Sequence, residues 1–428
     1  MRRRHNIALA TVAFLGTILL VAQHRSEYRH THVTHASYDT KESNTGIEVL
    51  PSDLKPSSHS HYASGSGADP EKSVTLHDDG SPAQGDSEGD SSTTPPLLEN
   101  SSLDGQTVLE PEYAFQKDLD LLLPIPVLQR FSTHEPHNYV PGGTEKYAYA
   151  TFLATRNTSL KDPYFLAIHS LIYRLLWSPK SRTQKHPFVV FVADFVTPEQ
   201  RALLSGAGAL VRELAPLPWF PNVAGVQHRW KDLFAKLHMW RETEFSRILF
   251  LDADAFPLSP LDEIFTTVLP KSSPCIPEKL HLDDFLADGP VCEDYIFAGI
   301  PQDPFNTEHP NINVGSMLFT PSLRMHQRLL QNYVKTDKYD CKMAEQAFLN
   351  WQFSPASAFP ATKLERTWGG FFPKEEEKGN LKVVHEKIWV AEGGWMKEEW
   401  EQGWRDMIGF YEGEEFVRAR KGDAKVEG

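Results

Sequence analysis

The sequence predicts an α/β domain with a Rossmann-like sheet, and three observations support this fold class. From residue 145 onward, short apolar runs alternate with amphipathic segments, as expected for strands connected by helices. One apolar run, residues 248–251, is followed directly by the acidic triplet Asp252-Ala253-Asp254. Residues 23–107, in contrast, contain no sustained hydrophobic period. We therefore expect the folded domain to occupy the second part of the chain.

The composition of the 428-residue chain limits its function. A formal net charge of −14 argues against a nucleic-acid partner, which requires a basic surface. The three cysteines, Cys275, Cys292 and Cys341, form neither a disulfide-rich scaffold nor a CxxC zinc motif. In an oxidising compartment Cys275 and Cys292 could close one loop and leave Cys341 unpaired, but the sequence alone does not establish this pairing.

The amino terminus has the features of a membrane anchor. Residues 1–6 include three arginines, and residues 7–22 form an uncharged apolar run. Since a spanning helix needs about 17–25 residues, the run is also compatible with a cleaved signal peptide. The sequence after it has no clear small-x-small cleavage site, which favours an uncleaved signal anchor. Residues 1–6 would then be a cytoplasmic tail, and the remainder would be lumenal in a single-pass type II orientation.

The segments on either side of the domain differ from it in composition. Residues 23–107 are rich in Ser, His, Asp, Gly and Pro, so they cannot bury enough apolar surface to offset the entropy of ordering. They are predicted to be a disordered stem. Residues 108–144 carry short apolar pieces and are predicted to be an arm that packs on the domain, 145–412. Residues 413–428 are charged and are predicted to be a flexible tail.

The first half of the domain is expected to contain a parallel sheet with right-handed crossovers. Its predicted strands are residues 147–155, 188–193, 210–214 and 248–251. Asp162-Pro163 predicts a helix start with a cap and a first-turn proline. Thr197 and Gln200 form a capping-box pattern at the next helix. Residues 230–243 are predicted to form the helix before the acidic triplet.

The second half begins with a proline-rich insertion, residues 269–310, which is expected to be irregular. The predicted elements after it are a strand at 312–319, helices at 322–336 and 342–353, and a short strand at 382–385. Three tryptophans follow, and they either stack on an acceptor sugar or pack within a helix; they are Trp395, Trp400 and Trp404.

The acidic triplet is the strongest functional signal. Carboxylates at i and i+2 after a buried strand lie at the edge of the sheet where open α/β folds bind ligands. Hard oxygen ligands suit Mg2+ or Mn2+, and such an ion can hold a diphosphate. The alternative is a solvated turn whose aspartates cap the next helix. Because the sequence contains no GxGxxG or GxxxxGK[ST] motif, neither a dinucleotide site nor a P-loop is indicated.

Residues 147–389 resemble the family 8 glycosyltransferases, the group that includes glycogenin. The resemblance depends on the order of several motifs: Leu153-Ala154-Thr155, residues 236–240, Asp252-Ala253-Asp254, Asn313-x-Gly315, residues 345–350 and Val383-Val384-His385. It implies a GT-A-type nucleotide-diphospho-sugar transferase fold with a mixed sheet flanked by helices. With its predicted anchor and stem, the chain is also similar to fungal Golgi members, some called N-acetylglucosaminyltransferases.

The resemblance implies a retaining transfer of N-acetylglucosamine or glucose from a UDP-sugar to a glycan or glycoprotein acceptor in the Golgi lumen. The implied cofactor is Mn2+, or Mg2+, with Asp252, Asp254 and His385 as its ligands. The implied donor-binding residues are Leu153, Ala154, Thr155, Lys236, Asp252, Ala253, Asp254, Gly315 and Lys387. Asn313 and Gly315 would line the donor sugar, with the glycine leaving room for it. Glu345, Gln346 and Asn313 are the implied catalytic residues.

Each of these residues also has a purely structural interpretation. His385 fits a core or surface histidine, Lys236 a helix-surface lysine, and Glu345 a first-turn acidic residue favoured by the helix dipole. The family's closing motif has a glycine and a Lys-Pro-Trp after the histidine, whereas residues 385–389 are shorter and lack glycine and proline. An inactive UDP-sugar- or glycan-binding scaffold on the same fold is therefore the alternative. A glycoside hydrolase is disfavoured, because its two carboxylates must flank a glycosidic bond.

Overall fold

The computed structural model describes residues 114–142, 147–219, 223, 226, 228–303, 306 and 308–423. The predicted cytoplasmic tail, anchor and stem, residues 1–107, lie outside the described residues. Among the residues that are described, no helix is both long enough and apolar enough to cross a membrane.

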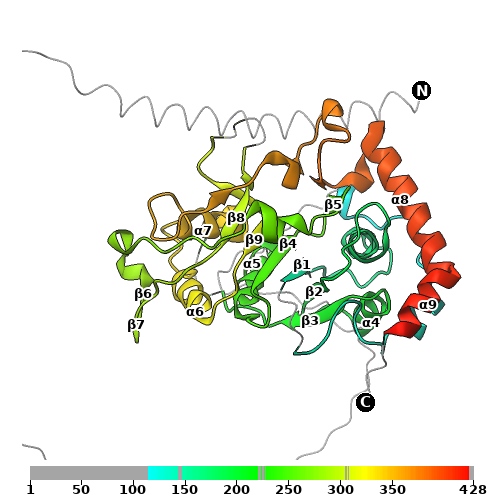
Figure 1. Cartoon of the computed structure of the whole chain (residues 1–428), viewed down its shortest axis with the longest axis horizontal. Helices are drawn as coiled ribbons and strands as arrows, with labels where there is room; N and C mark the ends of the chain where they lie inside the picture. Colours follow the sequence, from blue (N-terminus) through cyan, green and yellow to red (C-terminus); the bar gives the residue numbers. More distant parts are fainter. Residues whose placement is uncertain are drawn as a thin grey trace, which may run out of the picture. The chain divides into compact units, whose positions relative to one another are not determined.

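A seven-stranded mixed sheet forms the centre of the described domain (Figure 1). Its strand order is β10-β8-β9-β4-β1-β2-β3. The strands predicted before the acidic triplet pair in parallel, whereas β9 runs antiparallel to both β4 and β8. The bounds are β1 Tyr147–Leu153, β2 Phe188–Ala193, β3 Leu210–Leu214, β4 Arg247–Leu251, β8 Phe297–Pro301, β9 Ile312–Phe319 and β10 Thr362–Lys363.

Helices pack around this sheet, and their starts follow the predicted caps. Asp162 accepts a hydrogen bond from the Phe165 amide at the start of α3, and the Thr197–Gln200 capping box is formed at α4. The α-helices are α2 Ile125–Arg130, α3 Pro163–Ile172, α4 Pro198–Gly206, α5 His228–Leu233, α6 Leu323–Asn332, α7 Ala344–Gln352, α8 Gly394–Glu412 and α9 Glu414–Gly422.

Two predicted segments differ from what the structure shows. Residues 230–243 do not form one α-helix, because α5 passes into a 3-10 helix, η3 (Phe234–Arg241). The insertion at 269–310 contains a strand of the main sheet, β8, and a small hairpin of β6 (Phe285–Leu286) and β7 (Gly289–Pro290). Cys275 and Cys292 form a disulfide in this insertion, and Cys341 is a buried thiol.

The described part of the predicted arm, residues 114–142, packs on the domain. The side chains of Leu128 and Phe131 are buried in the core. At Gly206 in α4, a Cβ atom would lie 2.0 Å from the Leu128 carbonyl oxygen, so only glycine permits this approach of α2. The described part of the arm therefore contributes side chains to the core of the domain.

The predicted flexible tail is wrong for residues 414–422, which form α9 (Figure 1). Its Phe416 and Arg420 are buried, because α9 packs with α8 and the arm. In α8 the three tryptophans are at most 7% exposed, so they pack within the helix interface and do not offer a surface to an acceptor sugar.

A second sheet of three strands brings the carboxyl-terminal segment to the acidic triplet. Its order is β11-β12-β5, where β5 is Ala255–Pro257, β11 is Gly370–Phe371 and β12 is Val383–His385. Because β12 pairs antiparallel with β5, His385 lies opposite Ala255. The register therefore places His385 beside Asp254.

Candidate active site

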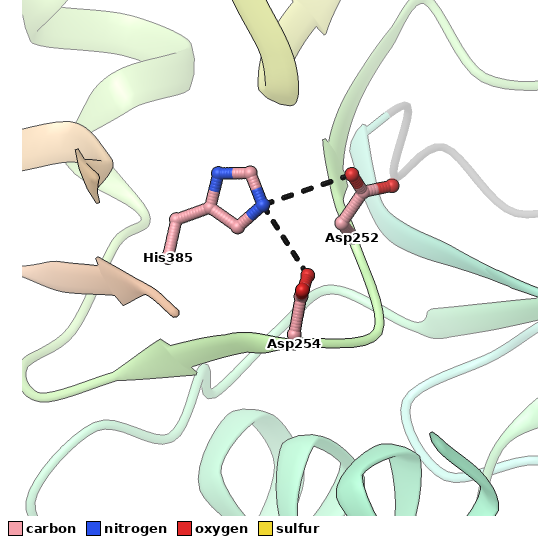
Figure 2. A group of neighbouring side chains, drawn as sticks. All are labelled: Asp252, Asp254 and His385. Carbon is pink, nitrogen blue, oxygen red and sulfur yellow. Dashed lines mark ion pairs between the residues drawn. The ribbon is translucent and has the colours of Figure 1, made fainter. Parts of the chain in front are cut away.

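Asp252, Asp254 and His385 meet at one point (Figure 2). The Nε2 atom of His385 lies 3.2 Å from Asp254 Oδ1 and 3.7 Å from Asp252 Oδ2. One ligand atom from each residue lies within 4.8 Å of the others. A search of the described residues for three or more neighbouring His, Cys, Asp or Glu side chains that could hold a metal ion finds these three.

The chemistry of this group fits the predicted metal. Two carboxylates and one imidazole suit Mn2+, which accepts nitrogen as well as oxygen ligands. The His385 side chain is 10% exposed, and its Nδ1 is buried with no hydrogen-bond partner among the described residues. The structure thus brings together all three predicted ligands, and metal binding itself stays a prediction.

The charges around Asp254 stabilise its ionised form. Lys387 Nζ lies 3.0 Å from Asp254 Oδ2. Burial acts to raise the pKa of Asp254, but Lys387 and His385 outweigh burial and hold this pKa well below its usual range. Burial likewise acts to lower the pKa of His385, and the Asp254 carboxylate outweighs it and raises that pKa. Lys387 therefore reaches the site despite the shortened motif that follows His385.

Lys236 is not the helix-surface lysine of the structural interpretation. It lies in η3, its side chain is 3% exposed, and its Nζ is 2.8 Å from both Asp252 Oδ1 and Glu345 Oε1. Burial acts to lower the pKa of Lys236, but the two carboxylates outweigh burial and raise it. Burial raises the pKa of Glu345, whose Oε2 is buried without a hydrogen-bond partner in the described part of the chain.

The structure gives a second reason for glycine at position 315. A Cβ at this position would lie 2.0 Å from Cε1 and 2.6 Å from Nε2 of His385. The glycine therefore makes room for the imidazole, and the expected room for the donor sugar stays a prediction. Asn313 Oδ1 accepts a hydrogen bond from the Gly315 amide at 2.8 Å, and Gln346 Oε1 accepts one from Val314 at 3.2 Å. Both side chains support the backbone of β9.

A pocket of about 390 Å³ adjoins the acidic triplet. Predicted site residues form part of its wall: Leu153, Ala154, Thr155, Lys236, Asp252, Ala253 and Asp254. The described wall does not include the other predicted residues, which are Asn313, Gly315, Glu345, Gln346, His385 and Lys387. The pocket therefore contains seven of the predicted donor-binding residues, whose role in binding a nucleotide stays a prediction, and Glu345 is linked to it through Lys236.

Several residues of the pocket were not expected from the sequence. They include Gln116, Arg156, Asn157, Asp162, Tyr164, Arg229 and Asp232. The sequence identified Asp162 only as a helix cap, and nothing in the sequence pointed to the arm residue Gln116 as part of the site. Thr155 Oγ1 donates a hydrogen bond to Asp162 Oδ2 at 2.9 Å. Burial raises the pKa of Asp162 to about 6, although its hydrogen bonds from Phe165 and Thr155 act to lower it.

Comparisons with known proteins give several relatives, although no protein-family model matches the chain. An uncharacterised protein of Schizosaccharomyces pombe is 26% identical over 324 residues, covering 66% of this chain and 84% of that protein. Galactinol synthase 3 of Arabidopsis thaliana is 27% identical over 265 residues, covering 59% of this chain and 74% of the synthase. Galactinol synthase 1 of Solanum lycopersicum is also 27% identical, over 252 residues, covering 56% and 70%.

Among solved structures, mouse xyloside xylosyltransferase 1 is similar with a TM-score of 0.38 and 13% identity, covering 58% of this chain and 99% of that one. The glycosyltransferase GlyE of Streptococcus pneumoniae gives 0.40 and 15%, covering 66% and 67%. Since both TM-scores are below 0.5, they carry no part of the assignment. The similarity to galactinol synthases and the Asp–Asp–His group at the edge of a mixed sheet support a hexosyltransferase with a GT-A-like fold.

Proposed function

We propose that this protein transfers a hexose from a UDP-sugar to a hydroxyl group of a glycan or glycoprotein, with retention at the anomeric carbon and with Mn2+ as cofactor. The observation that carries the proposal is the Asp252–Asp254–His385 group beside a pocket of about 390 Å³. A pocket of this volume lies in the range that encloses small ligands and cofactors. The end of β1, at Leu153-Ala154-Thr155, would receive the uridine.

Each of the predicted site residues has a separate proposed role. Asp252, Asp254 and His385 would hold the ion, which when bound acts as a Lewis acid that stabilises the leaving UDP. Lys236 and Lys387 lie against Asp252 and Asp254 and would add positive charge near the diphosphate. Glu345, held by Lys236, would face the reacting sugar after the donor enters. The acceptor hydroxyl would approach on that side.

The donor, the acceptor and the compartment are further proposals. The resemblance favours N-acetylglucosamine or glucose as the transferred sugar, and the names of the galactinol synthases add galactose to the donors worth testing. The basic residues 1–6, the apolar run 7–22 and the polar stem support a type II protein of the Golgi membrane with a lumenal domain, similar to fungal N-acetylglucosaminyltransferases. An inactive lumenal binding scaffold is the second candidate, because residues 385–389 depart from the family motif.

The test is a donor screen with the full chain in detergent. UDP-glucose, UDP-galactose and UDP-N-acetylglucosamine are each incubated with Mn2+, and the released UDP is measured before and after chelation. The Asp252→Ala and Asp254→Ala variants are compared with Asp337→Ala, which changes a side chain that is 74% exposed. UDP release that stops on chelation and in the first two variants is expected.

Three other outcomes would contradict the proposal. Binding of UDP and Mn2+ without sugar release or transfer to any tested acceptor would favour the binding scaffold. Full turnover in Asp252→Ala or Asp254→Ala would show that the acidic triplet is not the metal site. Absence of UDP binding in the wild type would overturn both candidate functions.

A further inference from the structure

The start of the described arm, residues 114–121, contacts the segment that follows His385. The indole N–H of Trp389 donates a hydrogen bond to the Phe115 carbonyl oxygen at 3.1 Å. The ammonium group of Lys387 lies 5.0 Å from the centroid of the Phe115 ring, a distance at which a cation–π interaction is favourable. The same ammonium group is paired with Asp254. The arm therefore touches a residue that is in direct contact with the acidic triplet.

The same stretch of the arm is fixed to the loop that follows β1. Asp118 accepts hydrogen bonds from Asn157 Nδ2 at 2.8 Å and from Ser159 Oγ at 2.5 Å. One residue further, the Leu119 amide donates to the Lys161 carbonyl oxygen at 2.9 Å. Asn157 itself lines the pocket. The pocket-lining loop after β1 and the segment around Lys387, which are far apart in the sequence, are thus both bound by a few consecutive arm residues.

Gln116 lies between these two attachments, and it is part of the pocket wall. Gln116 is only partly buried and lies in the short 3-10 helix η1 (Ala114–Gln116). A primary amide can both donate and accept hydrogen bonds. It can therefore pair with phosphate oxygens, ribose hydroxyls or the polar edge of a uracil.

We propose that the arm is a part of the donor-binding site, in which Gln116 contacts the uridine diphosphate moiety. Asp118 is a positioning residue, since it fixes the arm to Asn157. Phe115 is a second positioning residue, because its ring and carbonyl oxygen hold Lys387 and Trp389 in place. The inference deepens the proposed function and rests on it, because it takes the pocket to be the site of a UDP-sugar.

The test measures the dissociation constant of UDP in the presence of Mn2+ by titration calorimetry with the full chain. Gln116→Ala is expected to raise this constant about tenfold, the effect of losing one or two hydrogen bonds to a charged or polar ligand. Asp118→Ala is expected to raise the KM for the donor severalfold with little change in kcat, because it loosens the pocket wall and leaves the reacting groups in place. Lys117→Ala, an exposed neighbour in the same segment, is the matched control and should leave both values unchanged.

The thermal midpoint of each variant shows whether the fold is retained. If Gln116→Ala and Asp118→Ala keep their midpoints and bind UDP as tightly as the wild type, the arm is only a packing element and the inference is wrong. If the wild type itself binds no UDP, the proposed function fails, and the inference fails with it. If Lys117→Ala weakens UDP binding as strongly as Gln116→Ala, a specific contact by Gln116 is excluded.

Discussion

Replacing Lys236 with methionine tests whether this buried cation holds the acidic site together. The side chains of Lys236 and Glu345 are 3% and 4% exposed, whereas that of Asp252 is 29% exposed. Methionine keeps most of the aliphatic volume and removes the charge. Removal of one partner from a buried ion pair costs about 3–5 kcal/mol. Since water can reach Asp252, Glu345 carries most of this penalty, and we expect the free energy of unfolding to fall by about 3 kcal/mol.

The pH dependence of this loss has a defined sign. In Lys236→Met, the pKa of Glu345, already raised by burial, is expected to rise further because its counter-ion is gone. When the pKa of a carboxyl group is higher in the folded than in the unfolded state, the free energy of unfolding decreases as the pH rises through the pKa of the folded state. The variant should therefore be closer to the wild type at pH 5 than at pH 8.

Urea denaturation at the two pH values, followed by circular dichroism, measures these differences. The double variant Lys236→Met/Glu345→Gln should recover about 2 kcal/mol, because it removes the unpaired charge. Lys397→Met is the control, since its pair with Glu401 is exposed and worth less than about 1 kcal/mol. The reasoning is refuted if Lys236→Met is no more destabilised than Lys397→Met, or if the double variant is less stable than the single one.

Three further predictions concern the site and the core. Gly315→Ala should weaken Mn2+ binding at least tenfold, because its Cβ would displace His385. The control Gly409→Ala should bind Mn2+ as the wild type does, since its Cβ would meet no heavy atom within 4 Å. Equal Mn2+ affinities of the two variants, measured by calorimetry, would contradict this prediction. Burial lowers the pKa of His169 to about 3, so below pH 6.5 this imidazole is protonated in the unfolded state but stays neutral in the folded state. The free energy of unfolding should therefore fall by about 2 kcal/mol from pH 7 to pH 5. His169→Leu should flatten this part of the stability profile in urea titrations, and an unchanged slope would exclude His169 as its source. Arg420→Met should lower the free energy of unfolding by about 3 kcal/mol, because the fully buried guanidinium donates to carbonyl oxygens of the arm and α4; a loss below about 1 kcal/mol would contradict that role.

The sequence predicts the parts of the fold that depend on local patterns. The strands β1, β2, β4 and β9 coincide with largely apolar runs, and the caps at Asp162 and Thr197 depend on side chains within three residues. β8 was missed because its apolar run, between Phe297 and Ile300, is short and lies in a segment rich in proline. The antiparallel pairing of β9 with β4 depends on contacts distant in sequence, which periodicity does not report.

The candidate site likewise contains residues that the sequence identifies and residues that only long-range contacts bring into place. Asp252 and Asp254 could be identified because two carboxylates directly after a buried strand have few structural uses. His385 required the resemblance to a family, since a lone histidine more often belongs to a core. The pairing of Lys387 with Asp254 spans 133 residues, and the contact of Gln116 with the pocket involves a segment that precedes the sheet. Neither contact has a local signature, because each arises only when β12 pairs with β5 and the arm packs on the domain. Residues of this kind determine how charge is arranged around the acidic triplet, so the departures of this chain from the family motif at 385–389 do not by themselves remove a cation from the site.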